Sequence, residues 1–282
     1  MKTAETPRDA PRNDSARNRA GQNFAGRHLA RRAAPGRWRG WVIPLAAIAA
    51  WWLAVHTGIS RSPMLVSPGL VLHTALDQVV TGKLWRALAA SFAREFAGFA
   101  IGTVLGLLLG GALGLSRGFQ RVVGPSFNTF KQVSLFAWIP LISVWFGLGD
   151  AAKVVFLSLA ALVPVVVNTC DGIRNTPAGL LEVARVHGYT RPQTIVSVIL
   201  PCAVPSIFTG VYLALIYSWL ATIGAEYLLV AGVGIGNTLI DGSEHFRMDL
   251  VIFGMTVVGL VGWGLNALAR LIERRLARWR SA

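Results

Sequence analysis

Few residues in this sequence could carry chemistry, and they form no catalytic set. Cys170 and Cys202 stand near the edges of apolar segments, where small packing residues are expected. The histidines are scattered, with neither zinc-ligand spacing nor a Ser/His/Asp arrangement. No Gly-x-x-x-x-Gly-Lys-Ser/Thr loop is present to hold phosphates. We therefore expect no enzyme activity, no metal site and no cofactor in this chain.

Two ionisable residues lie in or beside apolar segments. Glu226 is late in an apolar run, and because an unpaired charge inside a membrane is costly, we expect a gating or structural role. The alternative is a position near the outer interface, where the carboxylate is solvated or capped by a neighbour. Lys131 is interpreted as snorkelling to the interface, with a position facing a transport pathway as the alternative.

Residues 171–204 form a loop with helix start and stop signals. Thr176-Pro177 combines a capping hydroxyl with proline at the first helical position, and Gly188 is the residue type that follows a helix end. Thr190 and Gln193 have the spacing of a capping box for a second helix, which meets a proline at 201. The loop therefore predicts two short helices with a bend at Gly188.

The first of these helices carries residues that could contact a partner. Ala184 and Gly188, four apart, share one side and leave room for a partner surface. Glu182 and Arg185, three apart, can pair with each other or reach a partner. An ordinary amphipathic loop helix is the alternative interpretation.

This loop resembles the EAA loop of binding-protein-dependent ABC import permeases. That pattern reads Glu-Ala-Ala, three residues, Gly, nine residues, Ile, any residue, Leu-Pro. Here Val183 replaces the second Ala and Val198 replaces Ile. The matching positions are Glu182, Ala184, Gly188, Leu200 and Pro201.

Further motifs resemble the sulfonate, taurine and nitrate permease subfamily, over about residues 60 to 280. They are Trp138-Ile139-Pro140-Leu141, Trp145-Phe146-Gly147-Leu148-Gly149, Gly172-Ile173-Arg174, Ala225-Glu226 and Gly232-Val233-Gly234-Ile235-Gly236.

The resemblance implies a function, a coupling site and partners. The bent loop would be the coupling helix, with Glu182 to Gly188, including Arg185, docked on a separate ATP-binding subunit that binds the ATP. Other implied partners are a periplasmic or lipid-anchored substrate-binding protein and a second permease copy, giving a homodimer in the membrane lipid. The implied substrates are aliphatic sulfonates or taurine, with nitrate or a vitamin precursor as alternatives.

Composition indicates a membrane protein. Residues of the hydrophobic class make up 54% of the 282, and only 14% are charged, whereas soluble domains carry about 25%. Six segments are close to the length of a bilayer span. They are residues 41–57, 96–115, 125–148, 154–170, 205–230 and 250–272. The predicted fold is thus an all-α polytopic membrane protein of about six transmembrane helices with a cytoplasmic coupling helix.

The basic residues predict how the chain is oriented. Ten of the 27 Lys/Arg lie between Met1 and Arg39, so residues 1–40 are expected to be a disordered basic cytoplasmic tail and 41–282 the permease domain. The tail, the connection at 117–121, the connection over 171–204 and the C-terminus together carry 20 of the 27, which places both termini in the cytoplasm. The resemblance implies a bacterial inner membrane. This clustering at the ends argues against a nucleic-acid-binding protein.

The connection over residues 59–93 is expected on the outer side. It predicts one or two short helices on the membrane surface, with an apolar stripe of Leu70, Leu76, Val79, Val80 and Leu84.

Two other functions are considered. A self-contained secondary transporter or channel would need paired intramembrane charges or broken helices in two related halves. The sequence shows no clear repeat that would form two such halves. A membrane enzyme would need a metal or nucleophile cluster.

Overall fold

The computed structural model describes residues 39–57, 66–229 and 231–276, and within these ranges the regular structure is helical. The chain divides into two compact units, Met1–Ser60 and Arg61–Ala282. In the first unit, helix α2 (Arg39–His56) forms at the first predicted span. Nearly all of the predicted tail, residues 1–40, lies outside the described residues.

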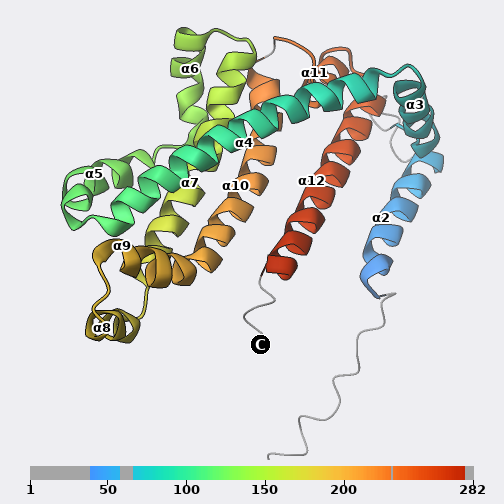
Figure 1. The fold of residues 1–282 in the computed structure, drawn as a ribbon. Coiled ribbons are helices and arrows are strands. Elements are labelled where there is room, and N and C mark those ends of the chain that lie inside the picture. Colours follow the sequence, from blue (N-terminus) through green and yellow to red (C-terminus); the bar gives the residue numbers. More distant parts are fainter. Residues whose placement is uncertain (1–38, 58–65, 230, 277–282) are drawn as a thin grey trace, which may run out of the picture. The chain divides into compact units, whose positions relative to one another are not determined.

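The second unit contains the remaining helices (Figure 1). In chain order they are α3 (Pro68–Val80), α4 (Lys83–Leu115), α5 (Arg117–Phe130), the 3₁₀ turn η1 (Leu135–Trp138), α6 (Ile139–Phe146), α7 (Asp150–Arg174), α8 (Ala178–Val186), α9 (Arg191–Thr194), the π-helical η2 (Ile195–Ile199), α10 (Leu200–Leu228), α11 (Ile235–Glu244) and α12 (Met248–Leu276).

Several of these helices are long and apolar enough to cross a membrane. Among the described residues they are Lys83–Leu115, Asp150–Arg174, Arg191–Leu228 and Met248–Leu271. A fifth crossing results if Arg117–Phe130 and Leu135–Phe146, which are bent by 94° at their break, count as one span. The protein is therefore a multi-pass membrane protein, while the count of six spans stays a prediction, since the apolar part of α2 covers only Leu45–His56.

The third span predicted for residues 125–148 is broken in the structure, and a single crossing there stays a prediction. The helix ends at Phe130, and residues 131–134 form turns before η1 begins at Leu135. Pro140 lies in the first turn of α6. Because proline has no backbone N–H, it cannot donate the hydrogen bond that would continue a helix from the preceding residues. The chain therefore changes direction within the third predicted span.

Helix α7 is the centre of the second unit, since α4 and α10 both pack along it. On α4, glycines recur every four residues on the side that faces α7. A Cβ added at Gly98 would lie 2.5 Å from Cβ of Leu157, and one at Gly106 would lie 2.7 Å from Cβ of Val165. Small residues at this spacing let two membrane helices approach closely.

The surface helix expected in residues 59–93 is present as α3, which begins at the Ser67 cap. Its predicted apolar stripe is exposed at Leu70, Leu76, Val79 and Val80. Leu84 differs, because it already belongs to α4, where it is buried.

The bent loop and α11 lie at opposite ends of α10. Figure 1 shows α8 beyond the ends of α7 and α9, whereas α11 lies at the far end of α10. Candidate functional residues occur at both ends of α10 and in the region between these ends.

Candidate functional site

Helix α8, the first helix of the bent loop, begins one residue later than predicted. Pro177 precedes α8 and acts as its cap residue. The Thr176 hydroxyl donates to the carbonyl of Ile173 at 2.9 Å, so it closes the end of α7 and does not cap α8. The predicted helix is present, but the roles of Thr176 and Pro177 as cap and first helical residue are wrong.

Gly188 makes the predicted bend. Its φ of +72° is left-handed, a conformation that side-chain-bearing residues rarely adopt. The next residue, Tyr189, donates its N–H to the carbonyl of Ala184 at 3.0 Å, and Gly188 donates to Arg185 at 3.0 Å. These bonds satisfy carbonyls at the end of α8 in the manner of a glycine-terminated helix.

The second half of the loop joins α10 without a break. The capping box is confirmed, since the Thr190 N–H donates to Oε1 of Gln193 at 2.8 Å. The helix then continues through the π turn η2, so Pro201 lies in the first turn of α10 and ends no helix. Pro201 lacks an N–H and its ring clashes with the carbonyl four residues before, which the wider π turn accommodates.

The predicted coupling residues divide into exposed and buried ones. Glu182, Arg185, Leu200 and Pro201 are exposed. Ala184 is only 3% exposed, because α8 packs back against η2 within the loop. The expectation that Ala184 leaves room for a partner is therefore wrong: its small side chain lets the loop close on itself.

The exposed side of α8 is partly apolar. Val183 and Val186 are 54% and 86% exposed, and Leu180 is also exposed. Between α8 and the start of α10 lies a cavity of about 270 Å³, lined by residues such as Val183, Tyr189 and Pro201. A small protruding helix with apolar and charged residues is the kind of element that fits a groove on another protein.

A second group of residues surrounds Glu226 at the opposite end of α10. Glu226 is 1% exposed, so its carboxylate is not solvated but is capped by neighbouring groups, as the second form of the alternative expected. Its Oε1 accepts from Nη2 of Arg94 at 2.5 Å and from the hydroxyl of Ser91 at 2.7 Å. Its Oε2 accepts from the N–H of Gly236 at 2.8 Å. We call Ser91, Arg94, Glu226 and Gly236 the Glu226 cluster.

The glycine-rich loop after α10 is shaped by this carboxylate. A Cβ on Gly236 would lie 2.6 Å from Cβ of Glu226, and a Cβ on Gly234 would collide with the carboxylate itself. Ile235 donates its N–H to the Ser91 hydroxyl at 3.0 Å, and Arg94 donates to the carbonyl of Val233 at 2.7 Å. The loop closes over the Glu226 cluster and leads into α11.

Helix α7 adds two charged residues beside the cluster. Asp150 accepts from Nη1 of Arg94 at 2.9 Å and remains 68% exposed. Lys153 is fully buried and donates to the carbonyl of Ala231 at 2.5 Å. Together with the cluster, these contacts link α4, α7, α10 and the loop before α11.

A further buried carboxyl lies next to Arg94 in the sequence. Glu95 is 0% exposed and accepts from the hydroxyls of Ser218 and Thr222 at 2.6 and 2.7 Å. Both hydroxyls come from α10, so this carboxyl connects α4 to α10 inside the helical core.

Most of these residues could not be singled out from the sequence. The predicted second span began at residue 96, so Arg94 and Glu95 lay outside it, and Lys153 lay just before the fourth span at 154–170. The available signal was the Arg94-Glu95 pair between Leu88 and Phe96, since charges in an apolar helix usually have partners inside the protein.

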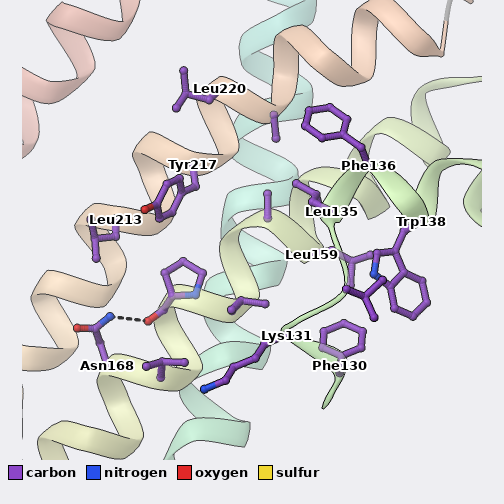
Figure 2. Close-up of a pocket in the computed structure, with 16 residues that line it drawn as sticks. Phe130, Lys131, Leu135, Phe136, Trp138, Leu159, Asn168, Leu213, Tyr217 and Leu220 are labelled. Atoms are coloured by element: carbon purple, nitrogen blue, oxygen red, sulfur yellow. Dashed lines mark hydrogen bonds between the residues drawn. The ribbon is translucent and has the colours of Figure 1, made fainter. Parts of the chain in front are cut away.

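A groove of about 490 Å³ lies between the bent region of 130–138, α7 and α10 (Figure 2). Aromatic side chains line it, among them Phe130, Phe136, Trp138 and Tyr217. Lys131 and Asn168 lie together at one end, and Phe136 and Leu220 lie at the other (Figure 2). Lys131 lines this groove and is itself exposed, so snorkelling and a position facing a transport pathway both stay predictions.

Comparison with known proteins identifies the family. The model for the binding-protein-dependent transport system inner membrane component matches residues 84–281. The putative aliphatic sulfonates transport permease of Escherichia coli (strain K12) is 39% identical over 242 residues, which cover 86% of this chain and 92% of that protein. The taurine transport system permease of the same strain is 28% identical, covering 81% of this chain and 85% of that one.

Solved structures have the same fold. An inward-facing form of the MetNI methionine ABC transporter matches with a TM-score of 0.59 at 22% identity, covering 71% of this chain and 99% of that one. An amino acid ABC transporter crystallised with histidines matches with a TM-score of 0.60 at 21% identity, covering 71% and 97%. The chain belongs to the family of binding-protein-dependent transport system inner membrane components.

Proposed function

We propose that this chain is the permease subunit of an importer that carries aliphatic sulfonates across the cytoplasmic membrane. The observation that carries the proposal is the 39% identity to a putative aliphatic sulfonates permease over 86% of this chain. Taurine, nitrate and bicarbonate occur in the names of more distant relatives, and they are the alternative substrates in the test below.

ATP binding and hydrolysis belong to a separate partner chain in this proposal. The sequence has no phosphate-binding loop of its own, and α8 is an exposed helix suited to docking. The docking surface consists of Glu182, Arg185 and the exposed valines 183 and 186, while Ala184, Gly188, Leu200 and Pro201 give the loop its shape. ATP acts by favouring one arrangement of the partner subunits over another.

Two copies of this chain, two ATP-binding subunits and an extracytoplasmic substrate-binding protein make up the proposed assembly. Both termini and α8 are on the cytoplasmic side, in accordance with the distribution of basic residues. The Glu226 cluster is then on the outer side, where it holds α4, α7 and α10 together during the switch.

The experiment is a mild-detergent purification of the tagged chain from its native membrane, followed by mass spectrometry and reconstitution with the binding protein. Copurification of an ATP-binding subunit, with ATP hydrolysis stimulated by alkanesulfonate, supports the proposal. Stimulation by taurine, nitrate or bicarbonate alone would contradict alkanesulfonate as the substrate and still support the permease function. Purification of the chain only with itself would contradict the importer.

A further inference from the structure

The groove of Figure 2 has a composition that suits one chemical class of ligand. Its walls are aromatic and aliphatic, and its volume of about 490 Å³ is within the range of small-molecule sites, about 300–1,000 Å³. Among the described residues that line it, Lys131 is the charged one, and no carboxylate is among them. The groove is thus apolar along its length and cationic at one end.

The polar end is ordered by α7. The Asn168 amide donates to the carbonyl of Pro164 at 2.8 Å, which fixes its side chain at the end where Lys131 lies (Figure 2). Asn168 is six residues before the end of α7 at Arg174, so this end is about 9 Å along the axis from the loop that carries α8.

A second cavity continues from Lys131 toward that loop. It has a volume of about 240 Å³, and Lys131 and Val167 line both spaces. Arg174 lines it with Asp171, and the guanidinium of Arg174 is held by the carbonyl of Leu113 at 2.9 Å. Two cations therefore follow each other in the direction of the proposed cytoplasmic side.

We infer that the groove binds the apolar tail of an alkanesulfonate, with the sulfonate group at Lys131 and Arg174 as the next contact toward the cytoplasm. This inference rests on the proposed function and adds the part of the substrate that the permease itself recognises. Nitrate and bicarbonate have no apolar part to occupy the aromatic walls. Taurine carries an ammonium group, which Lys131 repels and the apolar walls cannot solvate.

The first test is uptake of labelled hexanesulfonate by the complete importer in its native membrane. Lys131→Gln lowers the rate at least tenfold, and Lys131→Arg keeps at least half of it. Lys83→Gln, which changes an exposed lysine at the start of α4, is the control and keeps the wild-type rate. Wild-type uptake by Lys131→Gln would overturn the inference.

The second test places a thiol in the groove of the assembled complex. Lys131→Cys in a Cys170→Ser, Cys202→Ser background loses uptake, and aminoethyl methanethiosulfonate, which attaches an ammonium group, restores at least half. The neutral methyl reagent restores none. In a Leu213→Cys variant of the same background, which keeps Lys131 and has its thiol in the groove, hexanesulfonate slows the modification at least threefold, whereas taurine and nitrate do not.

Two outcomes of this labelling would overturn the inference. No protection by hexanesulfonate would mean that something else, such as the second copy, fills the groove. Protection that follows the anionic lipid content of the vesicles would assign Lys131 to lipid headgroups. If the wild-type complex with its ATP-binding subunit takes up no sulfonate at all, the proposed substrate fails, whatever Lys131 does.

Discussion

Nη2 of Arg94 in α4 lies 2.5 Å from Oε1 of Glu226 in α10, and both side chains are buried, at 6% and 1% exposure. The same guanidinium also binds Asp150, which is 68% exposed. One arginine therefore has a buried and an exposed carboxylate partner. Breaking a buried ion pair is costly because the remaining charge has lost its partner, whereas an exposed pair contributes little.

Removing the charge of Glu226 is expected to destabilise the protein far more than removing that of Asp150. Glu226→Gln leaves Arg94 buried without its main partner, at a cost of about 3–5 kcal/mol in the free energy of unfolding. Asp150→Asn changes little. The thermal unfolding midpoints of the two purified variants, read side by side, check this; equal midpoints would contradict the placement of Glu226.

The glycine loop is expected to tolerate no side chain next to Glu226. Gly236→Ala puts a methyl group 2.6 Å from Cβ of Glu226, and overpacking of this kind costs about 1–3 kcal/mol. Gly111→Ala in α4 is the control, because nothing lies within 4 Å of its added Cβ. We expect a lower unfolding midpoint and lower uptake only for Gly236→Ala. A midpoint unchanged from wild type would refute the close contact.

The α4–α7 contact allows a similar comparison between two glycine substitutions, both on α4. Gly106→Val collides with Val165, while the Cβ of Gly111→Val enters open space. We expect Gly106→Val to reduce the amount of folded protein in the membrane severely, and Gly111→Val to leave it near the wild-type amount. Fluorescence-detected size exclusion of tagged variants measures this. Equal peaks would show that α4 and α7 do not approach closely.

Two substitutions at Gly188 separate the effect of backbone conformation from the effect of side-chain size in the bent loop. Its left-handed conformation costs about 1–2 kcal/mol for most residues, but asparagine adopts it more readily. We expect Gly188→Asn to keep most of the uptake, and Gly188→Glu to lose it while the protein stays in the membrane. Uptake assays with membrane quantification check this prediction. Wild-type uptake by Gly188→Glu would contradict the coupling role.

The sequence predicted the helical class and the bent loop well, because both depend on local signals. Capping by Thr190 and Gln193 and the bend at Gly188 are encoded within a few residues of each other. Span boundaries were less accurate. The apolar segment of α4 was cut at residue 96 because Arg94 and Glu95 are charged, and their partners are more than 100 residues away on α10.

Long-range contacts also explain the error at Ala184. Its small size predicted space for a partner, but its actual neighbour is η2 of the same loop. A periodic pattern shows which residues share a side of a helix, and it carries no information on which chain covers that side. The groove at Lys131 could not be predicted from the sequence for a related reason, since its walls come from three separate helices.

The central claim is that α8 docks on an ATP-binding subunit, and the most direct measurement is site-specific photo-cross-linking in the native membrane. A photoreactive amino acid at Val186, the 86% exposed residue of α8, should give an adduct with the ATP-binding subunit. The same group at Val104, which is exposed in the middle of α4, should give none. An adduct from 186 alone is the predicted result; no adduct from 186, or equal adducts from both positions, would contradict the account.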